Sequence, residues 1–312
     1  APCTKYGPPP SLARPLASDM GRLSPLESNS PLWYHSPKRQ EIFQKGYPML
    51  KIKEYIKPKT LAEAYELNQK KGNVILGGML WLKLSDKRVN TAIDLSGLEL
   101  DTIEETKEAF RIGAMVSLRQ MEQYQGLNHY TGNAVKEALK PIVGVQFRNC
   151  ATLGGSVFGR YGFSDVLTLL LAMDTYVELY QRGVLPLEQF LVEGGGRDIL
   201  TAVIIKKVPL QIQYISQRNT KTDFAVLNCA VAKRGGNFYC TIGARPGRAV
   251  RFVDEENILA DGITEESAAA FARHIQEQVK VGSNMRAGAE YRRRIAKVLV
   301  RRALLAMEGD IR

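Results

Sequence analysis

The stretch QFRNCATLGGSVFGRYGFSDVLTLLLAMD, residues 146–174, decides the fold of this chain. Its Gly154-Gly155 pair lets backbone amides approach a ligand, because no Cβ stands in the way. The apolar run at 166–173 predicts a buried helix with Ser164 or Asp165 as its N-cap. We therefore predict a glycine loop that leads into a helix N-terminus, an arrangement that suits an anion.

A glycine pair before a helix is also a common turn, so this stretch alone is equally consistent with a structural role. The chain has no G-x-G-x-x-G between a predicted strand and a helix, and no G-x-x-x-x-G-K-[ST]. A Rossmann fingerprint and a P-loop are therefore excluded, and any phosphate site must be of another kind.

Length, hydrophobicity and charge limit the kind of protein and the partners that this chain can have. The 312 residues have room for two or three packed units, and 45% of them are hydrophobic. No apolar run reaches the roughly 18 residues that span a membrane, and no signal-peptide pattern is seen. The net charge of +11 indicates an anionic partner, such as a phosphate-bearing cofactor or an acidic protein surface. Because the basic residues are scattered, we expect no nucleic-acid partner and no membrane partner.

The four cysteines show no C-x-x-C spacing, so neither a zinc site nor an iron–sulphur cluster is expected. A predicted hairpin at Gly235-Gly236 would place Cys229 opposite Ile242 and Cys240 opposite Val231. The two sulphurs would then be diagonal neighbours, too far apart for an easy disulfide. This cysteine usage fits a reducing cytoplasm.

The chain changes character near Met49. Residues 1–48 hold nine of the fourteen prolines, so we expect a proline-rich extension without a core of its own. A strand at 51–56, a helix at 61–69 and a strand at 73–76 follow, and the last of these runs into a second glycine pair, Gly77-Gly78. The C-terminal third reads as antiparallel strands and two helices, and the arginines of Tyr291–Arg294 are expected on the solvated or partner-facing side of the second helix and not in a catalytic site.

Two segments taken together resemble a known family. VILGGMLWL (Val74–Leu82) and RNCATLGGSVFGRYGFSD (Arg148–Asp165) are similar to the FAD-binding medium subunits of molybdenum hydroxylases, the xanthine dehydrogenase and carbon monoxide dehydrogenase flavoproteins. The resemblance extends over nearly all of 49–312, including QRNTKTDFAVL (Gln217–Leu227) and AEYRRRIAKVLVRRAL (Ala289–Leu304). Either glycine pair alone would be weak evidence, but both in order with this C-terminal partner are specific.

The resemblance implies an α+β fold. A two-lobed FAD-binding domain of the PCMH type is expected at 49–208, with lobes at about 49–105 and 106–208 and a mixed sheet in the second lobe. A C-terminal flavoprotein domain with an antiparallel sheet and helices is expected at 209–312. FAD would lie between the two lobes.

The resemblance also implies which residues contact FAD. Both glycine segments would hold its pyrophosphate through Ile75, Leu76, Gly77, Gly78, Met79, Leu80, Trp81, Thr152, Gly154, Gly155 and Ser156. The Thr152 hydroxyl would donate to a phosphate, and Asp165 would accept from FAD hydroxyls. Phe158 and Tyr161 would lie near the isoalloxazine, with Ile199 and Leu200 as apolar contacts. Core packing of Phe158 and Tyr161, and helix capping by Asp165, remain alternatives.

Several positions depart from the family pattern. In the second segment Ser156 stands where Asn is usual, and residues 159–163 replace a small-Ser-Pro run before Asp165. Met79 and Leu80 stand where Thr or Ser and then an acidic residue are usual, and Ile215 stands at the position of a lysine near the flavin. These changes remove side-chain contacts and leave backbone contacts in place.

The function implied is electron relay. FAD would pass electrons from iron–sulphur clusters of a partner subunit to NAD⁺ or another acceptor, beside a molybdenum-cofactor subunit that carries out hydroxylation. We expect no catalytic acid, base or metal ligand in this chain. A scaffold subunit of the same fold that has lost flavin is the alternative, favoured by Met79, Leu80 and Ile215. A self-contained flavin oxidase is disfavoured, because no substrate-site acid or base is found.

Overall fold

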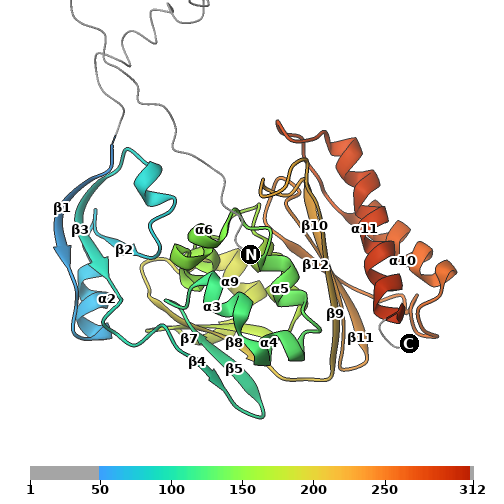
Figure 1. Ribbon diagram of the computed structural model, residues 1–312, viewed down its shortest axis with the longest axis horizontal. Helices are drawn as coiled ribbons and strands as arrows, with labels where there is room; N and C mark the ends of the chain where they lie inside the picture. Colours follow the sequence, from blue (N-terminus) through green and yellow to red (C-terminus); the bar gives the residue numbers. More distant parts are fainter. Residues whose placement is uncertain (1–48, 310–312) are drawn as a thin grey trace, which may run out of the picture. The chain divides into compact units, whose positions relative to one another are not determined.

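The computed structural model describes residues 49–309, arranged around three sheets (Figure 1). The proline-rich extension expected at 1–48 lies outside the described residues. None of the described helices is both long and apolar enough to cross a membrane.

The first sheet is small and parallel. Its order is β1-β3-β2, with β1 at Lys51–Ile56, β2 at Val74–Leu76 and β3 at Arg88–Asp94. Helix α2 (Leu61–Gln69) begins where the Thr60 hydroxyl accepts from the Glu63 amide, which satisfies one of the free N–H groups at its start. A short 3-10 turn, η2, follows at Leu82–Leu84.

The second sheet has five strands in the order β4-β5-β8-β6-β7, and every neighbouring pair is antiparallel. The strands are β4 (Ile103–Glu105), β5 (Ala109–Gly113), β6 (Thr175–Leu179), β7 (Gly183–Pro186) and β8 (Leu200–Lys206). The prediction of a mixed sheet is therefore wrong. β5 and β6 are parallel to each other, but β8 lies between them and is antiparallel to both.

Helices connect β5 to β6 and cover the second sheet. They are α3 (Leu118–Gln123), α4 (Gln125–Tyr130), α5 (Ala134–Leu139), α6 (Val145–Cys150), α7 (Leu153–Phe158) and α8 (Asp165–Ala172), and α9 (Leu187–Glu193) follows β7. Every residue of α8 is buried, because α8 packs against β10 and β11 of the C-terminal sheet as well as against its own lobe. Its N-cap is Ser164, whose hydroxyl accepts from the Leu167 amide at 3.1 Å.

The third sheet is antiparallel, as predicted, with the order β12-β11-β10-β9. Its strands are β9 (Leu210–Gln217), β10 (Leu227–Arg234), β11 (Asn237–Gly243) and β12 (Val250–Val253), followed by α10 (Glu265–Gln278) and α11 (Ala289–Gly309). The predicted hairpin register is confirmed: Cys229 pairs with Ile242, and Cys240 pairs with Val231. Both cysteines are buried and free.

Helix α11 packs on α10, β9 and β10, as Figure 1 shows for the red helices beside the orange sheet. Arg293 and Arg294 lie on its exposed side, as expected. Arg292 does not, because its side chain is fully buried. The periodicity of α11 predicted a solvated arginine cluster, but this one points inward toward backbone carbonyls.

Candidate functional site

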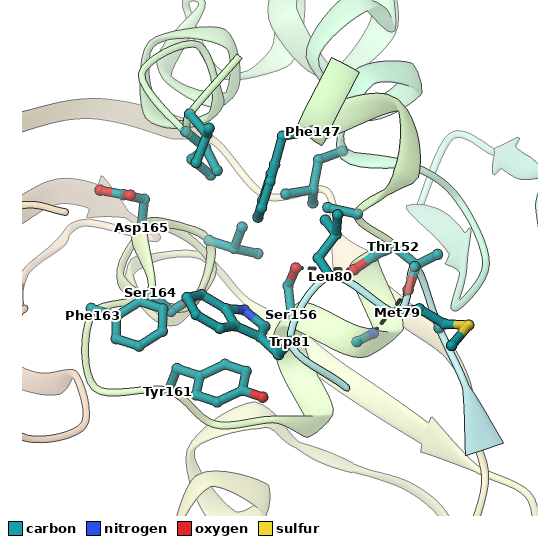
Figure 2. Close-up of a pocket in the computed structure, with 18 of the residues that line it drawn as sticks. Met79, Leu80, Trp81, Phe147, Thr152, Ser156, Tyr161, Phe163, Ser164 and Asp165 are labelled. Carbon is teal, nitrogen blue, oxygen red and sulfur yellow. Dashed lines mark hydrogen bonds between the residues drawn. The ribbon is translucent and has the colours of Figure 1, made fainter. Parts of the chain in front are cut away.

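A cavity of about 220 Å³ lies where three segments meet (Figure 2). The first segment is the glycine turn after β2, and the second is the region from the end of α6 to the start of α8. The third is the loop between β9 and β10, residues 218–226. The lining side chains are mostly apolar with a few polar groups among them, a composition typical of cofactor sites.

The first glycine pair allows these segments to meet backbone against backbone. A Cβ at Gly78 would collide with the carbonyl oxygen of Cys150, and a Cβ at Gly77 would lie 2.9 Å from Thr152 Oγ1. Met79 follows with a positive φ of 58°, a strained conformation for a side chain of this size. Among the described residues, the loop amides of Gly78 and Met79 are paired with no other group. They can therefore serve a ligand in the cavity.

The second glycine pair does not form an open loop. It lies in the first turn of α7, where Thr152 is the N-cap and its Oγ1 accepts from the Gly155 amide at 3.1 Å (Figure 2). The Gly154 amide donates to the Ala114 carbonyl at 2.7 Å, and the Ser156 hydroxyl donates to the Thr152 carbonyl at 2.9 Å. The amides expected to form an anion nest are thus already paired, and the Thr152 hydroxyl proton is the group left for a phosphate.

One side of the cavity is a cluster of four aromatic rings from all three segments. The Trp81 ring centroid lies 5.8 Å from Tyr161, 5.5 Å from Phe163 and 5.8 Å from Phe224, and the Trp81–Phe224 interplanar angle is 23°. Tyr161 and Phe163 stack on each other at 5.1 Å. The rings of this cluster that line the cavity could also stack on a flat aromatic ligand.

Another part of the lining is aliphatic, apart from one aromatic ring. Leu80 from the first glycine turn lines the cavity together with residues of α3, of α6 and of the turn before α6, which are Leu118, Ile142, Val143 and Phe147. No sequence signal marks these positions as part of a site, because ordinary apolar residues in helices predict core packing.

Asp165 lies at the first position of α8 and is held by the C-terminal sheet. Its Oδ1 accepts from Arg218 Nη2 at 2.5 Å, from Asn228 Nδ2 at 3.2 Å and from the Tyr214 hydroxyl. Burial raises the pKa of Tyr214 well above its ordinary value, and the nearby Asp165 charge adds to this. Burial lowers the pKa of Arg218, but the Asp165 charge outweighs it and the net direction is upward.

The Asp165 carboxylate points away from Thr152 and Ser156 in Figure 2. Capping by Asp165 is also excluded, since Ser164 is the N-cap.

Eleven of the residues predicted to contact FAD line this cavity. They are Ile75, Gly77, Gly78, Met79, Leu80, Trp81, Thr152, Gly155, Ser156, Tyr161 and Asp165.

Five others lie elsewhere. Leu76 packs in the core of the first sheet, and Ile199 is buried beside α2 and β3. Gly154 and Leu200 are buried within the second lobe. The Phe158 ring packs on Phe190 at 5.9 Å, which fits the core-packing alternative.

Four lining residues of the C-terminal loop were not predicted. They are Arg218, Thr222, Asp223 and Phe224. The signal for them was present, because the segment 217–227 carries part of the resemblance, but nothing in its pattern showed that it reaches the cavity.

Comparisons with known proteins agree with this geometry. Residues 49–210 match the model of the FAD binding domain in molybdopterin dehydrogenase, and residues 213–307 match the CO dehydrogenase flavoprotein C-terminal domain. The chain belongs to this flavoprotein family. It is thus an FAD-binding oxidoreductase component of the molybdenum hydroxylase type.

Individual relatives are distant. An uncharacterized Escherichia coli (strain K12) protein, YgfM, is 27% identical over 256 residues, which is 80% of this chain and 94% of YgfM. Mouse aldehyde oxidase 3 is 28% identical over 228 residues, 66% of this chain but 16% of that much longer protein.

Two solved structures share the fold. A carbon monoxide dehydrogenase chain from Hydrogenophaga pseudoflava has a TM-score of 0.75 at 23% identity and covers 82% of this chain and 97% of its own. A quinoline 2-oxidoreductase chain from Pseudomonas putida 86 has a TM-score of 0.74 at 21% identity and covers 85% and 99%.

The residues of the cavity fit FAD. Gly77 and Gly78 leave space that a Cβ would fill, and the adjoining amides and the Thr152 hydroxyl can donate to a phosphate. The aromatic and aliphatic sides can enclose a flat ring.

Proposed function

We propose that this chain is the electron-relay subunit of a multi-subunit molybdenum hydroxylase, working beside an iron–sulphur subunit and a molybdenum-cofactor subunit. Membership of the flavoprotein family supports this assembly. When bound, FAD would supply the redox chemistry that links the iron–sulphur clusters of the partner to NAD⁺ or another acceptor. A reducing cytoplasmic location is consistent with the free cysteines of the described residues.

The observation that carries the proposal is the close approach of the Gly77-Gly78 turn to Thr152 beside the aromatic cluster. In this arrangement the Gly78 and Met79 amides and the Thr152 hydroxyl would hold the pyrophosphate. Trp81 and Tyr161 would orient the ring system, and the aliphatic side chains would exclude water from it. Asp165 and Arg218 hold the C-terminal domain against the site and keep a neutral pair at its edge.

The test has two arms. Titration of the apo-protein with FAD should give stoichiometric, noncovalent uptake with flavin absorbance, and affinity purification from the native host should recover iron and molybdenum with the chain. Absence of flavin uptake by the folded protein would leave the scaffold role. Purification of a lone chain that itself hydroxylates an aromatic heterocycle would contradict the heteromer.

A further inference from the structure

Arg292 is a fully buried cation whose hydrogen-bond partners are oxygen atoms of uncharged groups. Its Nε donates to the Val226 carbonyl at 2.8 Å, and its Nη1 donates to the Gly282 and Ala287 carbonyls at 2.8 and 2.5 Å. Its Nη2 donates to Asn284 Oδ1 at 2.6 Å. Burial lowers the pKa of Arg292, and the neighbouring Arg286 charge lowers it further. The four hydrogen bonds offset the cost of burying this charge, and they fix the positions of the groups that accept them.

What surrounds it is a tight turn at residues 282–288. The Asn284 side chain, which accepts from Arg292, also accepts from the Arg286 amide at 2.9 Å. The Asn284 amide donates to the Ala287 carbonyl at 3.1 Å. The guanidinium of Arg292 thus fills the turn and fixes the backbone from which Arg286 projects.

Arg286 in turn holds the loop that lines the cavity. Its guanidinium donates to both carboxylate oxygens of Asp223, at 2.9 and 3.2 Å, and lies over the Phe224 ring at 4.9 Å. The hydrogen bond from Arg286 lowers the pKa of Asp223 despite the opposing effect of burial. Phe224 stacks on Trp81, and both rings line the cavity. Arg292 also binds Val226, just beyond this loop, so it fixes the loop from two directions.

We propose that Arg292 is a positioning residue that sets the aromatic side of the cavity, acting through Asn284, Arg286 and Asp223 on the Phe224–Trp81 stack. Arg292 does not touch the cavity itself. We call this series of contacts, from Arg292 to the Phe224–Trp81 stack, the side-chain relay. The identity of the ligand rests on the function proposed above, whereas the side-chain relay is argued from contacts within this chain alone. We therefore expect Arg292 to affect only part of ligand binding. Binding of an aromatic ring in the cavity should depend on Arg292, and binding of the phosphates by the glycine turn should not.

The relay can be measured without a ligand, because Trp81 is one of only two tryptophans in the sequence. In a Trp33→Phe background, the emission maximum and acrylamide quenching of the apo-protein report on Trp81. Trp81 is 41% exposed in the wild type. We expect Asn284→Ala, Arg286→Met and Arg292→Met to raise its quenching above the wild-type value, with Arg292→Lys intermediate because an ammonium cannot reproduce the four bonds. The matched control is Arg293→Met, which removes the same charge from the exposed side of α11.

Two further comparisons distinguish a specific effect through Arg286 and Asp223 from a general loss of structure around Arg292. The double variant Arg286→Met/Arg292→Met should raise the quenching of Trp81 by less than the sum of the two single variants, since both act through Asp223, while Arg292 also holds Val226 directly. Affinity for FAD should fall about threefold to tenfold in the relay variants, the value of one aromatic contact, while affinity for ADP stays unchanged.

The proposal is overturned if Asn284→Ala and Arg286→Met leave Trp81 as protected as Arg293→Met does, or if the effects of Arg286→Met and Arg292→Met add. It is also overturned if ADP and FAD affinities fall together. Should Arg292→Met fail to fold, Asn284→Ala and Arg286→Met still decide the matter. If wild-type protein binds no FAD, the proposed function fails, but the fluorescence result stands by itself.

Discussion

Arg218 donates to Asp165 across the boundary between the C-terminal sheet and the first turn of α8, at 2.5 Å. Both side chains are nearly buried, with exposed fractions of 10% and 7%. Tyr214 and Asn228 bind the same carboxylate oxygen, so one acidic side chain gathers donors from β9, β10 and the loop between them. Because Asp165 and Arg218 both line the cavity, the contact that joins the domains also forms part of the site.

Replacing Asp165 with Asn should destabilise the apo-protein. The amide keeps an acceptor but leaves the Arg218 charge without its counter-ion in a buried place, a loss of roughly 1.5–3 kcal/mol. Urea unfolding without FAD measures it, with Asp261→Asn on the exposed surface as control. Adding Arg218→Gln to Asp165→Asn should recover part of the loss, and strictly additive single effects would contradict the pairing.

Flavin titration of the folded Asp165→Asn protein then addresses a different question. If Asp165 also accepts from FAD hydroxyls, affinity falls by about 1 kcal/mol or more beyond the effect on stability. An FAD affinity equal to that of the wild type would mean that Asp165 serves only the contact between the domains.

The buried pair of Glu122 and Arg148 predicts a pH dependence of stability. Burial raises the pKa of Glu122, but hydrogen bonds from Arg148 at 2.7 Å and from Arg119 outweigh it, so the net pKa lies below the ordinary 4.5. A carboxyl with a depressed folded pKa stabilises the protein above its unfolded pKa, and this is lost as pH falls through the folded value. The unfolding free energy of wild type should therefore exceed that of Glu122→Gln by about 3 kcal/mol near neutral pH.

This difference should shrink as the pH falls below about 4.5, and urea unfolding at a series of pH values measures it. Glu104→Gln, at an exposed ion pair with Arg111, is the control and should show little change. A constant difference between wild type and Glu122→Gln across the acid range would exclude this role of Glu122.

Local signals explain how much of the fold the sequence predicted. The strand at 51–56 and the helix at 61–69 have the predicted bounds, since alternation, the Thr60 cap and Gly72 all act within a few residues. The insertion of β8 between β5 and β6 depends on pairing between residues about 90 positions apart, which no local pattern encodes. The burial of Arg292 could not be predicted from a local pattern either, because its side chain is held by carbonyl groups of segments distant in the sequence, such as that of Val226.

The residues of the site also divide into those that local sequence signals predict and those that they do not. Gly77, Gly78 and Thr152 could be found because a close backbone approach restricts residue type. Ile142, Phe147 and Phe224 could not, because any apolar side chain of suitable size would serve there. The short helix at α7 was missed because two glycines argue against a helix, while the Thr152 cap and contacts to Ala114 and Val116 stabilise it.

Gly78→Ala should weaken flavin binding strongly. The added Cβ would collide with the Cys150 carbonyl and force the glycine turn away from the segment that carries Thr152. Loss of alignment at the phosphates should cost more affinity than one hydrogen bond, at least about tenfold. FAD titration measures it, with Gly309→Ala as control, since a Cβ there meets nothing within 4 Å. Full occupancy in Gly78→Ala would contradict the close approach.

Thr152→Val should have two separable effects. Loss of the cap on α7, where Oγ1 accepts from the Gly155 amide, should cost about 1 kcal/mol of stability in the apo-protein. Loss of the hydroxyl proton should weaken FAD and ADP binding alike, because both ligands carry the pyrophosphate. Thr152→Ser keeps both functions and should resemble wild type; a defect in Thr152→Ser equal to that of Thr152→Val would mean that the methyl group, and not the hydroxyl, is required.

The last prediction separates Phe158 from Tyr161, the other aromatic residue expected beside the flavin, and from Trp81 of the glycine turn. Phe158 packs on Phe190 in the core of the second lobe, whereas Tyr161 and Trp81 line the cavity. Phe158→Leu should lower the unfolding free energy by about 1 kcal/mol or more and leave FAD affinity unchanged. Trp81→Leu should do the reverse, since Trp81 is 41% exposed and contributes little to the core, and Tyr161→Leu should behave like Trp81→Leu. Parallel thermal unfolding of the apo-proteins and FAD titrations give both quantities; a loss of FAD affinity in Phe158→Leu, at retained stability, would return Phe158 to the flavin site.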